Sequence, residues 1–168
     1  MASIEKKIEL LKDYFFQDPK ILMAFVFGSR TGDRTHAGSD WDIAVYFTPQ
    51  RRKIEWEDDS RDYPEEESVL GHCVDILKTD NVDLIVLNRA PARMAETAIR
   101  GMPLTIKDQR LFLEFMLIVT TEAEDYRRTS REYTEIYWRS KSLTEKDIEA
   151  LERRLVFIDT ELSALPEY

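Results

Sequence analysis

Two aspartates, Asp40 and Asp42, stand one residue apart at the start of an apolar run. The pair Gly28 and Ser29 precedes them, with ten residues between Ser29 and Asp40, and directly follows another apolar run, 21–27. A glycine turn after a buried strand can direct backbone N–H groups at a phosphate. Adjacent carboxylates repel each other unless a cation lies between them, and Mg²⁺ favours carboxylate oxygens together with substrate phosphates. These residue types and this spacing therefore predict metal-dependent phosphate chemistry.

The spacing of the two aspartates has little weight by itself. With 15 aspartates in 168 residues, about one such pair is expected by chance, so the context must decide. Side chains alternate along a strand, so Asp40 and Asp42 should point to one side and Trp41 to the other. Asp83 opens a later apolar run and would lie beside them if the two strands are neighbours. The competing interpretation is an acidic strand pair without catalysis.

The hydrophobic pattern predicts the elements that position these residues. Ser3 is a candidate N-cap of the first helix, and the strand over 21–27 should be buried on both faces. In order, we expect a helix over 3–16, strands over 21–27 and 42–47, a helix near 65–78, a strand over 82–88, a helix over 91–102 and an edge strand over 103–107. The charged segment 50–67 is expected to be a solvent-exposed surface loop.

Beyond Asp108 the sequence lacks glycine and has no proline before residue 166, which predicts two long helices over 108–140 and 143–165. Apolar residues from Ile148 to Leu165 recur at spacings of three and four, and Ser142 with Glu145 predicts a capping box. This stripe could pack on the preceding helix or on a helical partner. We therefore divide the chain into 1–107 and a helical extension, 108–168.

Composition narrows the function classes. The net charge of −9 argues against direct nucleic-acid binding, which needs a positive face. A single cysteine, Cys73, allows no internal disulfide and suits the cytoplasm. The charged N-terminus predicts no secretory signal, and the most apolar stretch, 21–28, is too short to span a membrane.

The stretch GSRTG followed by SDWDIAV resembles the minimal nucleotidyltransferase (MNT) antitoxins of the polymerase-beta-type superfamily, over roughly 20–107. The resemblance implies an α/β fold with a small mixed sheet flanked by helices. It implies that Mg²⁺ is held by Asp40, Asp42 and Asp83, which are also the catalytic residues, and that the nucleotide contacts Gly28, Ser29, Arg30 and Ser39. Trp41 departs from the family, in which isoleucine or leucine is commoner between the two aspartates.

These antitoxins transfer AMP from ATP to a tyrosine of a partner HEPN ribonuclease toxin. The resemblance therefore implies nucleotidyl transfer, with Asp83 as general base or shared metal ligand. Arg30 would contact a phosphate or form a surface salt bridge.

Three alternatives remain open at this point. The chain could be a binding-only antitoxin, or a nucleotidyltransferase acting on a small molecule such as an aminoglycoside. Arg30 and His36 also match the spacing of the HEPN ribonuclease motif, but they lie in a glycine-bearing turn instead of a helix.

Overall fold

The computed structural model describes residues 3–28, 40–50, 53–142 and 144–163. Its internal contacts divide the chain into two units, Met1–Glu124 and Asp125–Tyr168. The first unit contains the whole sheet and is described first. The boundary predicted at 107 stays a prediction.

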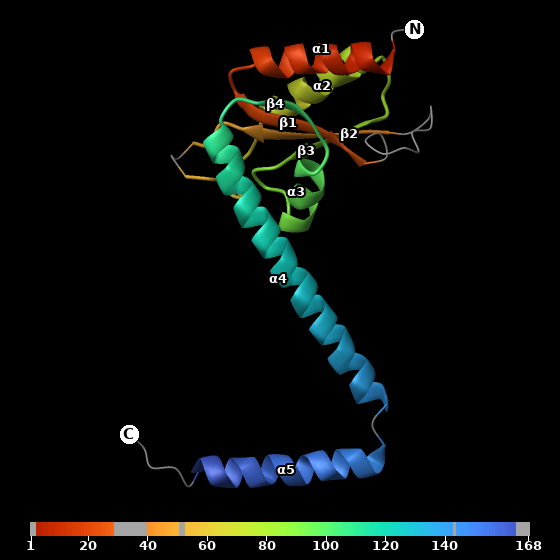
Figure 1. Cartoon of the computed structure of the whole chain (residues 1–168), viewed down its shortest axis with the longest axis vertical. Coiled ribbons are helices and arrows are strands. Elements are labelled where there is room, and N and C mark those ends of the chain that lie inside the picture. The colour runs from red at the N-terminus through yellow and green to blue at the C-terminus, as the bar shows by residue number, and fades with distance from the viewer. Residues whose placement is uncertain (1–2, 29–39, 51–52, 143, 164–168) are drawn as a thin grey trace. The chain divides into compact units, whose positions relative to one another are not determined.

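The sheet has four strands in the order β3-β2-β1-β4 (Figure 1). β1 pairs antiparallel with both β2 and β4, whereas β2 and β3 run parallel. The strands are β1 (Ile21–Phe27), β2 (Trp41–Phe47), β3 (Val82–Val86) and β4 (Met102–Ile106). The expected small mixed sheet is confirmed, and Pro103 lies on an edge strand, where a missing N–H is tolerated.

Two helices cover one face of the sheet, α1 (Ile4–Gln17) and α2 (Glu65–Leu77) (Figure 1). The predicted N-cap is correct, because the Ser3 side chain accepts a hydrogen bond from the Lys6 N–H. The core of this face contains Leu11, Phe15, Trp41, Ile43, Val69 and Leu77, all buried.

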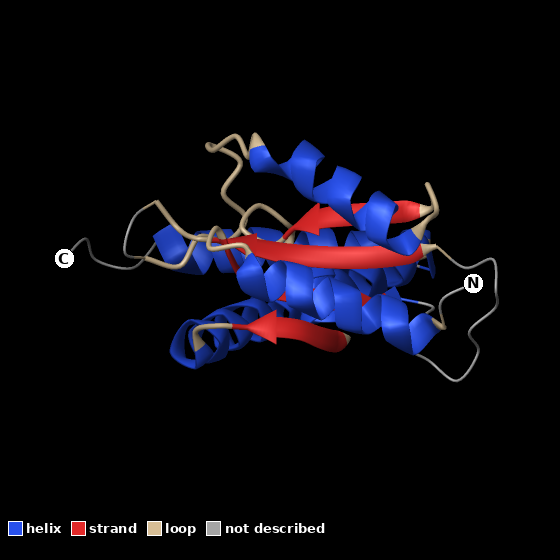
Figure 2. Ribbon diagram, turned by 90° about the horizontal axis from the view of Figure 1, so that it is seen from above, coloured by secondary structure: helices blue, strands red, loops and turns tan. Residues whose placement is uncertain are grey.

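Helices also pack on the other face of the sheet (Figure 1), and Figure 2 shows the strands and helices from above. They are α3 (Ala92–Ile99) and the first part of α4 (Gln109–Ser142). The core here contains Met23, Phe25, Tyr46, Ala95, Phe115 and Val119. Side chains of β1 enter both cores, which confirms a strand buried on both faces.

Two predicted elements are shorter than the pattern suggested. β3 ends at Val86, because Asn88 turns its buried amide toward the neighbouring strand: its Oδ1 accepts from the Phe47 N–H at 2.9 Å and its Nδ2 donates to the Phe47 carbonyl at 3.0 Å. α3 ends at Ile99, and Gly101 then lies so close to β1 that a Cβ atom would be 2.3 Å from the Val26 carbonyl.

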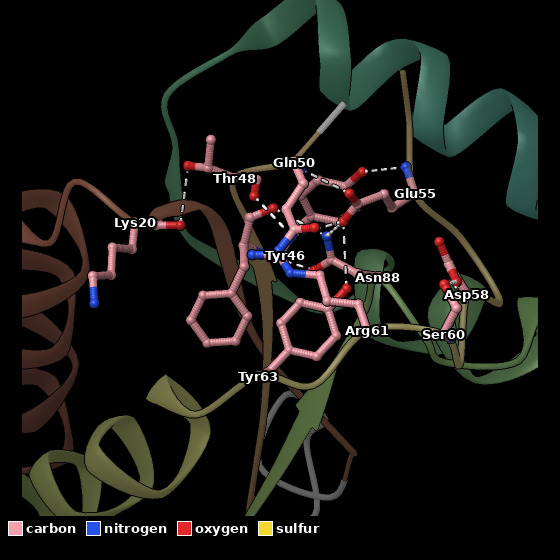
Figure 3. A network of polar contacts seen from close by, with 11 residues as sticks. Lys20, Tyr46, Thr48, Gln50, Glu55, Asp58, Ser60, Arg61, Tyr63 and Asn88 are labelled. Carbon is pink, nitrogen blue, oxygen red and sulfur yellow. Dashed lines mark hydrogen bonds and ion pairs between the residues drawn. The ribbon is translucent and has the colours of Figure 1, made fainter. Parts of the chain in front are cut away.

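Glu55 fastens the segment between β2 and α2 to the rest of the first unit (Figure 3). Its carboxylate accepts hydrogen bonds from the Gln50 N–H at 2.8 Å, from Arg61 Nη1 at 2.9 Å and from Asn88 Nδ2 at 3.1 Å. Its backbone N–H donates to the Tyr46 hydroxyl at 2.9 Å, and its side chain is only 10% exposed. The described part of this segment before α2 is a surface loop as predicted, with exposed residues such as Lys53, Glu57 and Asp59. Glu55 departs from the expectation, because a charge-rich composition does not show that one carboxylate will find several donors near the core.

The second unit contains the distal part of α4 and the helix α5 (Glu145–Ser163). The predicted cap at Ser142 is wrong, since that residue still belongs to α4. Thr144 is the cap instead: its N–H donates to Asp147 Oδ2 at 2.9 Å, and the Asp147 N–H donates back to its hydroxyl at 3.4 Å. Ser142 with Glu145 and Thr144 with Asp147 both fit the capping-box pattern. Because α4 extends to Ser142, only the second pair lies at the start of α5.

Of the stripe from Ile148 to Leu165, the described part includes the side chain of Ile148, which is 44% exposed. The other members of the stripe lie outside the described side chains, so its packing stays open. Among the described residues, no helix is both long enough and apolar enough to cross a bilayer.

Candidate active site

Asp42 and Asp83 lie directly opposite each other on neighbouring strands. The parallel register pairs Asp42 with Asp83 and, one residue earlier, Trp41 with Val82. Asp42 is half-buried, whereas Asp83 is exposed. Paired residues of adjacent strands project to the same side of a sheet. The parallel pairing therefore brings together two carboxylates that are far apart in the sequence.

Asp40 is the third acidic residue at this edge. It is exposed and lies just before the first residue of β2. Burial, followed by the negative charges of Asp83 and Asp40, raises the pKa of the Asp42 carboxyl above its ordinary value of 3.8. A positive ion at this point would favour the charged form of Asp42 and lower its pKa.

Trp41 points away from the carboxylates. Its side chain is 2% exposed and belongs to the core under α1 and α2. Side chains on the next residue of a strand project to the opposite face. The expected orientation of Trp41 is therefore correct, and its bulk does not enter the acidic edge.

Gly28 directly follows β1 and lies against Asp42. Its φ is +73°, a conformation that favours glycine. A Cβ atom on it would lie 2.1 Å from Asp42 Oδ2. Glycine is therefore required at this position for two reasons: the backbone has a positive φ, and Asp42 leaves no room for a side chain.

Gly101 is a residue of this region that the sequence analysis assigned only to the end of a helix. A Cβ atom on it would also lie 2.7 Å from the Phe27 Cβ, and Phe27 pairs with Asp42. Gly101 therefore lets the chain after α3 approach the end of β1. A glycine after a helix is so common that the sequence offered no signal for this second role.

Three of the predicted nucleotide-binding residues, Ser29, Arg30 and Ser39, lie outside the described residues, as does His36 of the ribonuclease-like spacing. Their roles stay predictions. The structure therefore places Asp40, Asp42 and Asp83 at the N-terminal ends of β2 and β3, and Gly28 at the C-terminal end of β1 beside Asp42.

The donor set at this edge fits a hard divalent cation. Carboxylate oxygens are the ligands Mg²⁺ prefers, and the raised pKa of Asp42 reflects burial and neighbouring negative charge that a cation would offset. Within the described ranges, no three or more His, Cys, Asp or Glu side chains are grouped so that they could hold a metal ion together. Mg²⁺ can bind through one or two carboxylates and complete its shell with substrate oxygens and water, and the three-aspartate site stays a prediction.

Residues 9–110 match the family described as polymerase beta, nucleotidyltransferase. This match covers more than half of the chain and includes all three aspartates. The chain belongs to the polymerase-beta nucleotidyltransferase family. Among curated proteins, none matches this nucleotidyltransferase by sequence.

Solved structures share the fold. A chain of a toxin–antitoxin complex with AMP-PNP gives a TM-score of 0.54 at 21% identity, covering 83% of the nucleotidyltransferase and 100% of that chain. A chain from the complex of tri-AMPylated Shewanella oneidensis HEPN toxin with MNT antitoxin gives 0.50 at 18% identity, covering 80% and 99%. A chain of an MntA-HpeT toxin–antitoxin variant with two Asp-to-Glu changes gives 0.53 at 22% identity, covering 84% and 100%. At these identities the likeness concerns the fold.

Proposed function

We propose that this nucleotidyltransferase transfers AMP from ATP to a tyrosine hydroxyl of a partner HEPN ribonuclease toxin, and so acts as its antitoxin. The observation that carries the proposal is the pairing of Asp42 with Asp83, with Asp40 close enough to influence the pKa of Asp42. Family membership supports the reaction class. The choice of acceptor is supported by a similar structure that contains an AMPylated HEPN toxin.

Asp40, Asp42 and Asp83 would hold Mg²⁺ in this proposal. When bound, the metal neutralises the triphosphate and stabilises the attacking and leaving oxygens. The half-buried Asp42 would be the central ligand, because its pKa responds to both of the other carboxylates and it is the least solvated of the three.

The transfer step is a displacement at the α-phosphorus of ATP. The tyrosine oxygen forms a bond to that phosphorus while the bond to the oxygen bridging to the β-phosphate breaks, so pyrophosphate leaves. The proton of the hydroxyl passes to Asp83, which is exposed and so accessible to a hydroxyl on another protein.

Gly28 would place backbone N–H groups against the nucleotide phosphates, because the absence of a side chain allows close approach. Ser29, Arg30 and Ser39 complete the proposed nucleotide site as hydroxyl and guanidinium donors.

A protein acceptor suits the charge of the molecule. The net charge of −9 and the acidic site disfavour a polyanionic acceptor such as RNA, so we expect no direct nucleic-acid binding and no membrane association. We also propose a cytoplasmic location, as for an antitoxin that acts on an intracellular ribonuclease.

The test uses the purified chain, ATP, Mg²⁺ and the protein encoded by the adjacent reading frame. Intact-mass spectrometry should show that this protein gains one or more AMP units, and tandem spectra should place them on tyrosine. The Asp42→Asn variant should lose the transfer. Asp75→Asn, an exposed aspartate of α2, is the matched control and should retain it.

The same experiment separates the alternatives. Tight binding of the partner without a mass gain would indicate a binding-only antitoxin. Consumption of ATP only in the presence of an aminoglycoside or another small hydroxyl compound would indicate a small-molecule acceptor. Either result would contradict the proposed acceptor.

A further inference from the structure

One face of α4 is buried in the first part of the helix and exposed to solvent in the distal part. Phe115, Val119 and Ala123 are fully buried on this face. At the continuing spacing of three and four residues, the face carries Tyr126 and Tyr133, which are 56% and 72% exposed. The three buried residues of α4 therefore belong to a longer stripe on this helix, and its distal part consists of exposed aromatic side chains.

Exposing a stripe of aromatic side chains to water is energetically unfavourable for an isolated helix. Helices are stabilised in proteins mainly by packing of their apolar face, and tyrosine is enriched where proteins contact each other. Ile136, beside Tyr133 on the helix, is 65% exposed as well. The distal part of α4 therefore presents a surface of the kind that is normally covered.

The length and sequence of α5 fit this surface. The distal part of α4, Asp125–Ser142, has 18 residues and spans about 27 Å, and α5 has 19 residues and spans about 28 Å. The sequence of α5 has its own apolar repeat, beginning at Ile148. An antiparallel α5 would therefore cover the distal part of α4 from end to end.

The charges of the two segments are complementary. The distal part of α4 has five basic and three acidic residues, whereas α5 has three basic and six acidic ones. Opposite net charges favour pairing of these helices with each other over pairing of each with its own kind. The net positive charge of the distal part of α4 therefore favours a partner helix with the net negative charge of α5.

The connection between the helices is short enough for α5 to be exchanged between two molecules. Only residues 143 and 144 separate Ser142 from Glu145, which is the shortest loop used in helical hairpins, and short hinge loops promote exchange of an element between copies. We propose that the distal part of α4 is a docking surface for α5 of a second copy of this chain. The reciprocal exchange forms a two-fold symmetric bundle of four helices.

This assembly is separate from the proposed reaction, because its residues lie in the second unit and the carboxylates lie in the first. Light scattering coupled to size-exclusion chromatography of the full chain, over a range of concentrations, should give twice the mass of one chain. Tyr133→Lys with Ile136→Lys should give the mass of one chain. Ile148→Lys on α5 should do the same.

Leu117→Lys is the matched control. Leu117 is also an exposed apolar residue of α4, 67% exposed, but it lies on the opposite side of the helix from Tyr133, so the variant should remain a dimer. Thermal unfolding of the first unit should be unchanged in all variants, which excludes misfolding as the cause. A monomeric wild-type chain, whose own α5 closes the stripe or whose stripe awaits another protein, would overturn the proposal. A dimer that survives either the α4 or the α5 substitutions would overturn it as well.

Discussion

Gly28 and Asp42 are in such close contact that no side chain fits between them: a Cβ atom on Gly28 would lie 2.1 Å from Oδ2 of Asp42. The glycine follows β1 and the aspartate is the second residue of β2. The glycine that is proposed to approach phosphate and the carboxylate that is proposed to bind metal are therefore in direct contact. A change in either should disturb both.

Replacing Gly28 with alanine should test this contact. Because φ is +73°, the backbone strain alone should cost about 1–2 kcal/mol of unfolding free energy. Displacement of Asp42 should lower the transfer rate on the order of 100-fold. Urea unfolding and the mass-based transfer assay measure the two effects.

The control for this substitution is Gly71→Ala. Gly71 lies within α2, and a Cβ atom on it would have no neighbouring atom within 4 Å, so alanine should stabilise the protein by about 0.5–1 kcal/mol. Equal effects of alanine at Gly28 and Gly71 would contradict the special role of the turn.

Removing the charge of Asp42 or Asp83 should separate activity from stability. Asp83→Asn should reduce AMP transfer by about 100-fold or more, and Asp42→Asn should be at least as damaging, because it removes the central proposed ligand. Neither change should lower the unfolding free energy by more than about 0.5 kcal/mol, since like charges repel each other here. Transfer that persists in the double variant would refute the metal assignment.

The stability of the metal-free protein should depend on the titration of Asp42. Its pKa is raised in the folded state by burial and by the charges of Asp83 and Asp40. The folded state therefore binds this proton more tightly than the unfolded state does, and the associated stabilisation is lost as the pH rises through the folded-state pKa. Unfolding free energies of the wild type and Asp42→Asn, compared from about pH 4 upward, should diverge, with the wild type losing more. Added Mg²⁺ should reduce this loss, and identical pH profiles would contradict the prediction.

The Glu55 network should be structural. Glu55→Ala would leave the partly buried Arg61, 17% exposed, without its carboxylate, together with the buried amide of Asn88. Loss of one member of such a network typically costs about 3–5 kcal/mol. Urea unfolding should show this loss, whereas Glu67→Ala, at an exposed position of α2, should stay within about 0.5 kcal/mol of the wild type. A small effect at Glu55 would mean that the segment is held by other contacts.

Local features of the chain were predictable because they depend on neighbouring residues. The apolar runs at 21–27 and 82–88 predicted strands, and the repeat beyond Asp108 predicted two helices, since the period of burial is set by local backbone geometry. Gly28 with the aspartate pair predicted phosphate chemistry through its spacing, and the family match over 9–110 agrees with that interpretation.

The exact ends of elements were less predictable. Ser142 and Thr144 both offer capping-box sequences, and only the last hydrogen-bonded turn of α4 decided between them. Asn88 continued an apolar run, but its buried amide pairs with the backbone of Phe47. In each case a side-chain hydrogen bond competes with continuation of the regular element, and the surrounding structure decides between them.

The sequence by itself thus determined the helices and strands, the glycine directly after the first strand and two of the three carboxylates as a local pair. Tertiary structure decided that β3 lies parallel to β2, so that Asp83 faces Asp42. It also decided that Glu55 accepts hydrogen bonds from Gln50 and Arg61 and so holds the charged segment after β2 in place. These contacts join residues far apart in the chain. Their free energy comes from burial and hydrogen bonding that exist only after the sheet has assembled, so no local pattern of residues records them.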